Sequence, residues 1–94
     1  RVDKYAPEVG VEPSGVIVDE MSKNWGEYKE EKIKLHWKLL LAPIRIQDYV
    51  IVHELTHFKH DNHTENFWHT VGSILPDYEQ RIEWLRKNGK TLKI

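Results

Sequence analysis

The 94-residue sequence contains no cysteine, one methionine and two phenylalanines. Without cysteine the chain has no disulfides and no thiolate metal site, so histidine and carboxylate are the strong metal ligands left to it. Charge is nearly balanced, with 14 Lys and Arg against 15 Asp and Glu. Because such a chain has no overall field to attract nucleic acid or an anionic bilayer, we expect no membrane partner and no direct nucleic-acid binding.

Long hydrophobic runs are also missing. The longest, Leu39 to Ile44, is too short to cross a bilayer, and no charged-then-apolar leader opens the chain. A cytoplasmic protein is therefore expected. The length suits one domain with a modest core. Since the chain starts at Arg1 and its one methionine is Met21, we expect a single domain over residues 1–94 that is a fragment of a longer chain lacking N-terminal sequence.

The first half of the chain has the pattern of a short antiparallel sheet. Lys4 to Gly10 is typical of a frayed helix end or a linker, because it contains Pro7 and Gly10. Two strands follow, one at Val16 to Val18 that extends to about Met21, and one at Ile33 to Leu41 that Pro43 ends. The charged residues 24–31 between them predict the loop of an antiparallel hairpin.

The alternation in the second strand assigns its side chains to two faces. Ile33, Leu35 and Trp37 belong to the core face, whereas His36 is expected to face solvent. The tryptophans and Phe67 are expected in the core, since aromatic side chains dominate small cores.

The second half of the chain predicts three helices. Asp48 offers an N-cap for a helix from Tyr49 to about His60. The run Val50-Ile51-Val52 would also suit a buried strand, but Leu55 and Phe58 continue a pattern that a helix buries.

Two further helices have clear start and stop signals. Thr64 caps a helix through about Leu75, which Pro76 stops. Asp77 and Gln80 resemble the capping box of a last helix that Gly89 ends.

The first helix contains the spacing H-E-x-x-H. His53 and His57 are four residues apart, so both imidazoles lie on one face and can reach a single ion. Glu54 lies about 100° further round the helix, where it can reach a water in an open coordination position. This arrangement is typical of zinc hydrolases, in which three protein ligands and a water surround the metal.

Two histidines compete to be the third ligand. His60 shares the face of His53 and His57, but on an unbroken helix it lies about 10 Å along the axis from His53, too far for one ion. His63 can fold back if the helix ends at Asp61-Asn62, which tolerate the left-handed conformation of a sharp exit. The geometry favours His63. With a third histidine required six residues after the motif, an accidental match has a probability of roughly a quarter of one per cent.

The HExxH segment and the segments around it resemble those of a known family. The strings "YVIVHELTH", "NHTENFW" and "LPDYEQRIEWL", preceded by "MSKNWGEY" and "LLLAP", are similar to those of the YgjP-like zinc metallopeptidases and, more distantly, of SprT-like proteases. The resemblance implies a minimal α+β zincin core in which a short antiparallel sheet packs on the HExxH helix and two further helices follow. It implies one Zn2+ per chain held by His53, His57 and His63, with Glu54 as general base. The chain departs from the family at Glu27-Tyr28, where many members have Ser-Cys.

These residues predict a zinc metallopeptidase in which Glu54 activates a zinc-bound water and peptides or unfolded proteins are the substrates. The strand Lys32 to Leu41 is expected to pair with an extended substrate, and Tyr78, His69 and Tyr28 are candidates for stabilising the oxyanion. Two alternatives stay open: hydrolysis of a nucleotide or other phosphate substrate at the same site, and a non-catalytic protein-binding module that zinc stabilises.

Overall fold

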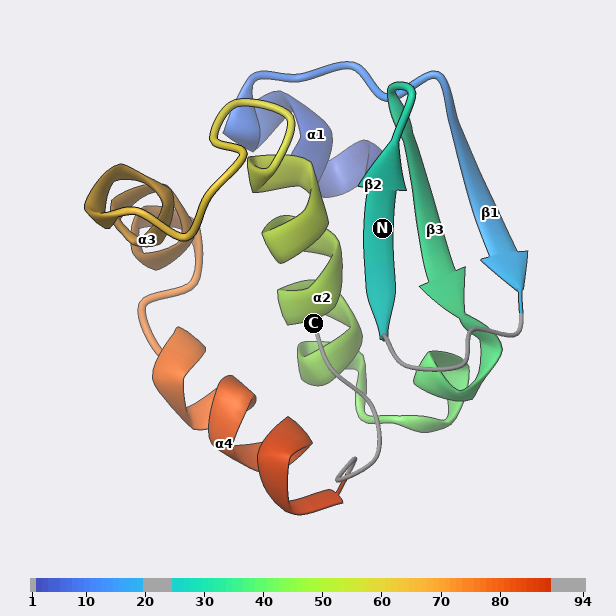
Figure 1. The fold of residues 1–94 in the computed structure, drawn as a ribbon. Helices are drawn as coiled ribbons and strands as arrows, with labels where there is room; N and C mark the ends of the chain where they lie inside the picture. Colours follow the sequence, from blue (N-terminus) through green and yellow to red (C-terminus); the bar gives the residue numbers. More distant parts are fainter. Residues whose placement is uncertain (1, 20–24, 89–94) are drawn as a thin grey trace.

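The computed structural model describes residues 2–19 and 25–88 and has an α+β fold (Figure 1). Its elements follow one another in the order α1 (Val2–Val9), β1 (Gly15–Asp19), β2 (Gly26–Lys29), β3 (Lys32–His36), the 3-10 helix η1 (Trp37–Leu41), α2 (Ile44–Thr56), α3 (Glu65–Ile74) and α4 (Tyr78–Asn88). The predicted α+β class, with a small sheet and an HExxH helix followed by two more helices, is confirmed. None of the described helices has the length and apolar character needed to cross a bilayer.

The sheet has the order β1-β3-β2, which differs from the predicted hairpin. β1 pairs with β3 in parallel, with Val16 beside Ile33, and β2 pairs with β3 in antiparallel register, with Tyr28 beside Ile33. The predicted loop therefore contains a strand. Its hairpin turn is Glu30-Glu31, in which both residues have positive φ, 52° and 64°. Glutamate is an unusual residue for such a turn, and this concealed the hairpin from sequence reasoning. The predicted extension of the first strand to Met21 lies outside the described residues.

The predicted second strand ends early, at His36. The chain then turns into η1, and the imidazole Nδ1 of His36 accepts a hydrogen bond from the backbone N–H of Lys38 at 3.0 Å. His36 is 4% exposed and Trp37 is 41% exposed, so the predictions of a solvent-facing His36 and a buried Trp37 were both wrong. Trp37 is exposed because the alternation of the strand stops applying where the backbone becomes helical. His36 is buried because its imidazole, at the last position of β3, turns towards η1 and caps it.

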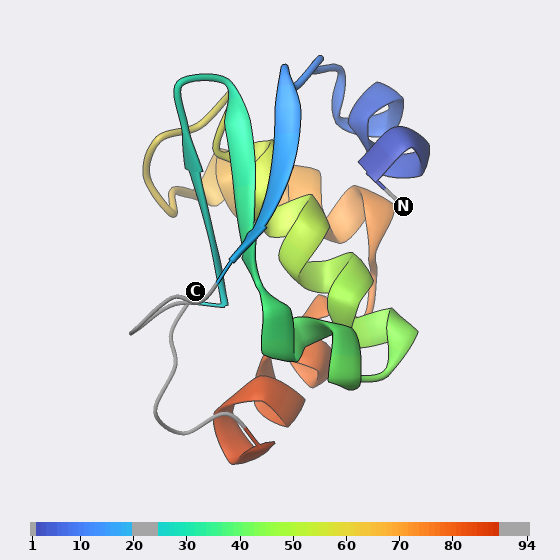
Figure 2. The same ribbon diagram turned by 90° about the vertical axis from the view of Figure 1, so that its right-hand side faces the viewer.

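α2 is the central element, with the sheet on one side and the other helices around it (Figures 1 and 2). It begins after Pro43, not at Asp48 as predicted. Asp48 is buried inside the helix, where its carboxylate accepts a hydrogen bond from the Tyr5 hydroxyl of α1 at 2.9 Å. Because α2 is covered on most sides, ten of its thirteen residues are buried. A helix buried in this way has apolar residues on nearly all faces, so its sequence also resembles that of a buried strand.

The ends of the other helices follow the sequence signals closely. Thr64 caps α3 by accepting a hydrogen bond from the N–H of Phe67, and α3 ends just before Pro76. α4 begins directly after Asp77, whose carboxylate accepts from Arg81, while its predicted stop at Gly89 lies outside the described residues. The segment predicted as a frayed helix or linker is α1, and Gly10, with φ of 86°, ends it.

Candidate metal centre

α2 and the loop after it bring three histidines together. The helix ends at Thr56, so His57 is its C-cap, and residues 57–63 form a loop that leads to Thr64. The Nε2 atoms of His53 and His57 are 3.2 Å apart, and Nε2 of His63 lies 3.2 Å and 3.1 Å from them. α2 ends earlier than predicted, but the chain does fold back so that His63 meets the other two imidazoles.

The spacing of these nitrogens fits a tetrahedral zinc ion. Three nitrogens bonded to zinc at about 2.05 Å in tetrahedral geometry would lie about 3.3 Å from one another, close to the observed triangle. A cation at the centre of the triangle is also favoured electrostatically. Each neutral Nε2 carries either a hydrogen or a lone pair, so at least two of the three are alike and face each other unfavourably. A cation between three lone pairs removes this conflict.

The far nitrogens of two rings have partners that favour this arrangement. His57 Nδ1 lies 3.1 Å from the carbonyl oxygen of His60, which can only accept, so Nδ1 carries the hydrogen and Nε2 the lone pair. His53 Nδ1 lies 3.1 Å from the hydroxyl of Tyr49, one helical turn earlier. Partners of this kind fix the ring orientation of metal-binding histidines.

Burial keeps the imidazoles of His53 and His57 neutral, which is the form that binds metal. It lowers the pKa of His53 to about 2, and the positive charges that His57 and His63 can carry contribute. The pKa of His57 is also lowered, mainly by burial, although the hydrogen bond to the His60 carbonyl opposes the shift.

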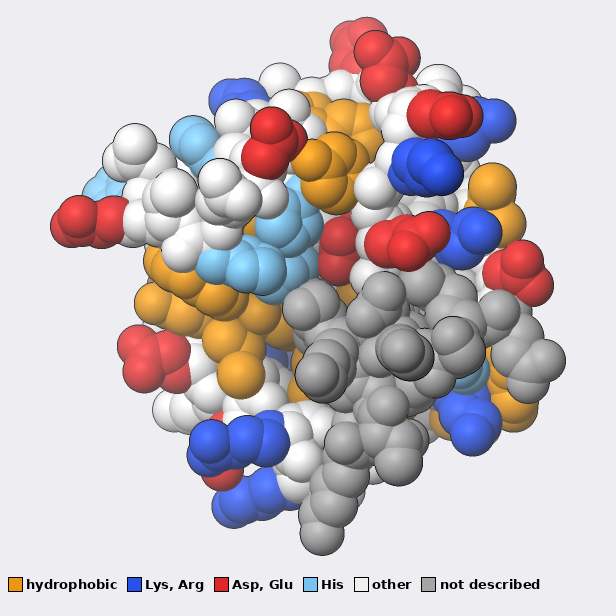
Figure 3. Space-filling model, viewed as in Figure 1, with side chains coloured by type: hydrophobic (Ala, Val, Ile, Leu, Met, Phe, Trp, Pro, Cys, Tyr) orange, Lys and Arg blue, Asp and Glu red, His pale blue; other side chains and the backbone are white. Residues whose placement is uncertain are grey.

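An aromatic layer from α3 supports the three rings. Phe67 is fully buried, and its ring centroid lies 5.0, 4.7 and 4.9 Å from those of His53, His57 and His63. Trp68 stacks on His63 at 5.7 Å. In Figure 3 the histidine side chains gather on this face, with hydrophobic side chains directly beside them. Sequence reasoning placed Phe67 in the core but missed its contact with all three histidines.

Glu54 is 2% exposed and faces the sheet. Burial raises the pKa of Glu54 to about 8, and the negative charge of Glu27 adds to the shift. A group with such a pKa can both take up and release a proton near neutral pH. The other competitor for the third ligand position, His60, contributes its carbonyl oxygen and not its ring.

The three oxyanion candidates lie at different places. The ring of Tyr28, on β2, stacks on the imidazole of His57, and its hydroxyl donates to Asp61, which raises the pKa of Tyr28. Tyr78 stacks on Trp68 at 5.4 Å and is thus one ring removed from His63. His69 is exposed on α3.

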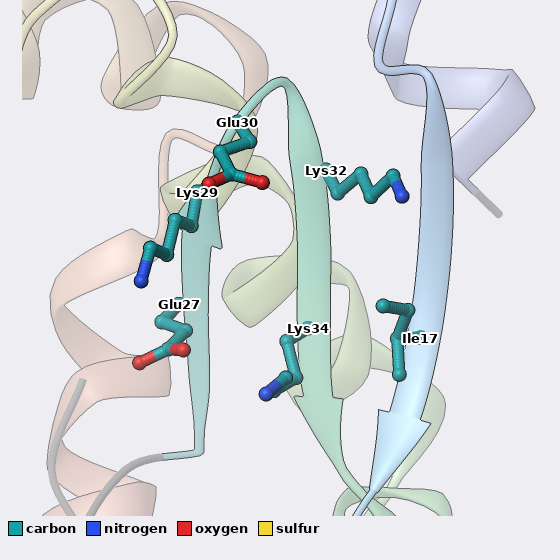
Figure 4. Close-up of a pocket in the computed structure, with 6 residues that line it drawn as sticks. All are labelled: Ile17, Glu27, Lys29, Glu30, Lys32 and Lys34. Carbon is teal, nitrogen blue, oxygen red and sulfur yellow. The ribbon is translucent and has the colours of Figure 1, made fainter.

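A separate hollow of about 220 Å³ lies on the outer face of the sheet (Figure 4) and contains none of the histidines. It is lined by Ile17, Glu27, Lys29, Glu30, Lys32 and Lys34. Its side chains carry charges of both signs, so the hollow differs in chemistry from the group of three histidines on the α2 side of the sheet.

Comparison with solved structures relates the whole fold to the metallopeptidases. The crystal structure of the metallopeptidase zymogen abylysin from Pyrococcus abyssi superimposes with a TM-score of 0.81 at 19% sequence identity, covering 99% of this chain and 95% of that one. The fold is therefore one that metallopeptidases use. The family model of the YgjP-like metallopeptidase domain matches residues 1–88, and the chain belongs to this family. A comparison with curated proteins gives no match.

Proposed function

We propose that this metallopeptidase domain is a zinc enzyme in which His53, His57 and His63 hold one ion and Glu54 is the general base. The observation that carries the proposal is the triangle of three Nε2 atoms with sides of 3.1–3.2 Å. Zinc in such a site acidifies water and polarises a carbonyl group. Among the described residues the group has three imidazoles and no fourth protein ligand. Such a set is typical of catalytic zinc sites, whereas structural sites are usually closed by four ligands.

Glu54 would move the proton. With its pKa near 8 in the absence of an ion, and lower beside a cation, its carboxylate can accept a proton from the attacking water. The same carboxyl group then donates that proton to the nitrogen of the leaving amine. Glu54 is buried in surroundings of low polarity. Its interactions with the attacking water and with the leaving amine are therefore stronger, because bulk water does not compete for them.

Peptide substrates would lie along β2. The predicted substrate strand, β3, is the central strand and is paired on both sides. β2 is the sheet edge beside α2 (Figure 1), and Tyr28 of β2 contacts His57. Within the described part of the chain, no strand pairs with the outer edge of β2. An extended peptide paired with this edge would be held through its backbone, so unfolded polypeptides of varied sequence suit this site.

The substitution Glu54→Gln tests the mechanism. Glutamine keeps the shape but cannot take up the proton, so zinc binding should persist while hydrolysis of unfolded proteins and mixed peptides falls about 10²- to 10⁴-fold. Elemental analysis of untagged protein should give one zinc per chain for both forms. Glu65→Gln, an exposed glutamate of α3, is the matched control. Equal cleavage by wild type and Glu54→Gln would contradict the mechanism, and zinc binding without any cleavage would favour a binding module.

A further inference from the structure

We propose that Tyr28 is a positioning residue for the metal centre, because its ring and its hydroxyl together hold His57 and the loop that carries His63. This inference rests on the three-histidine zinc site of the proposed function. Neither the HExxH motif nor its downstream histidine assigns a role to Tyr28, which comes from a strand about 30 residues earlier in the chain.

The ring of Tyr28 supports the imidazole of His57. The two rings stack with their centroids 5.2 Å apart and their planes 8° from parallel. His57 is the C-cap of α2, so it lies where the regular helix ends and backbone hydrogen bonds fix a side chain less firmly. The same tyrosine ring packs against Phe58 at 5.6 Å. A ring parallel to the imidazole restricts its rotation and keeps Nε2 directed at the other two histidines.

The hydroxyl of Tyr28 ties down the loop. It donates a hydrogen bond of 2.6 Å to the carboxylate of Asp61, two residues before His63. A hydrogen bond to a carboxylate is stronger than a neutral one. Residues 61–64 are exposed, and exposed loops with little packing open most easily. The bond to Tyr28 therefore reduces the number of positions that the His63 segment can adopt before it binds metal.

Both contacts act on the ligands and not on the ion. The hydroxyl of Tyr28 is engaged by Asp61, and its ring lies face to face with an imidazole. Positioning of this kind is expected to affect metal affinity, since loss of an outer partner typically costs about 10- to 100-fold.

The experiment measures zinc affinity of the whole chain by competition with a chelator. Tyr28→Phe removes the hydroxyl and keeps the ring, and it should weaken zinc binding about tenfold. Tyr28→Leu removes both and should weaken it further, within the range of about 10- to 100-fold. Asp61→Ala should match Tyr28→Phe, and the double variant should bind no more weakly than either single one, because both remove the same bond. The visible spectrum of the cobalt form should change in Tyr28→Leu and be restored towards wild type in Tyr28→Phe.

Tyr5→Phe is the matched control. It removes another tyrosine–aspartate hydrogen bond, of 2.9 Å, between α1 and α2, and should lower the melting temperature without changing zinc affinity. Wild-type protein that binds no zinc would overturn the proposed function. If wild type binds zinc, the role of Tyr28 alone would be overturned by either of two results. One is that the zinc affinities of Tyr28→Phe and Asp61→Ala are within twofold of wild type. The other is that they are no weaker than the zinc affinity of Tyr5→Phe.

Discussion

Gly26 of β2 lies directly against Glu54 of α2. A Cβ atom at position 26 would come 3.1 Å from Cγ of Glu54 and 3.0 Å from Cγ1 of Val50, both closer than ordinary contact. The missing side chain lets the edge strand approach the helix, and this approach helps to bury the Glu54 carboxyl group. A side chain at position 26 would thus require Val50 or Glu54 to move by a few tenths of an ångström.

We expect Gly26→Ala to destabilise the protein and reduce activity. The added methyl group would push β2 away from α2 and shift Glu54, and overpacking of this kind typically costs about 1–3 kcal/mol. Urea denaturation measures the loss. Gly15→Ala is the control, because the nearest atom there, Cγ of Lys32, would be 3.9 Å from the new Cβ. Equal stability of the two variants would show that β2 can move without cost.

We expect His63→Ala to lose zinc and His60→Ala to keep most of it. His63 provides one corner of the nitrogen triangle, whereas His60 provides its backbone carbonyl to His57, and an alanine retains that carbonyl. Elemental analysis and chelator competition distinguish the two. The reverse result would mean that the loop takes another path when metal binds.

We expect metal removal to lower the melting temperature by several degrees. Without a cation the three Nε2 atoms cannot all be satisfied, and a ligand present at 1,000 times its Kd stabilises the folded state by about 4 kcal/mol. Thermal unfolding with and without chelator measures the effect, after loss of metal has been confirmed. His63→Ala should respond little to chelator. An unchanged melting temperature in wild type would mean that packing alone preforms the site.

We expect the double substitution of Glu30→Asn with Glu31→Gly to stabilise the hairpin. Both glutamates have positive φ, which costs residues with a Cβ about 1 kcal/mol and which Asn-Gly adopts readily. The gain should be about 1 kcal/mol in urea denaturation. Glu30→Gln with Glu31→Gln removes the same charges but keeps both Cβ atoms. If that control gains as much, charge repulsion and not backbone strain explains the effect.

The helical half of the fold and the histidine group could be predicted from sequence because their determinants are local. The four-residue spacing of His53 and His57 and the cap at Thr64 depend on the geometry of one helix or one turn. The fold-back of His63 followed from the axial distance that excludes His60.

The sheet and the surroundings of the site could not be predicted because they depend on contacts between distant segments. The parallel pairing of Val16 with Ile33 leaves no local signal in the sequence. The strand that contains Tyr28 was predicted to be part of a loop because the residues around it are charged. The start of α2 was misplaced because Asp48, read as a cap, is instead the buried partner of Tyr5. The contact between Tyr49 and His53 could have been predicted, because residues four apart on a helix lie on the same face.

The central position of β3 has a consequence for the order in which the site is completed. Both β1 and β2 pair with β3, the last of the described strands, so the sheet can assemble once β3 has been synthesised. All three strands precede the histidines, which lie within eleven consecutive residues from His53 to His63, and contacts so close in sequence form fast. The strand that buries Glu54 is therefore made before the segment that brings the three imidazoles together. A chain that folds as it is made can have its sheet in place when this segment joins it.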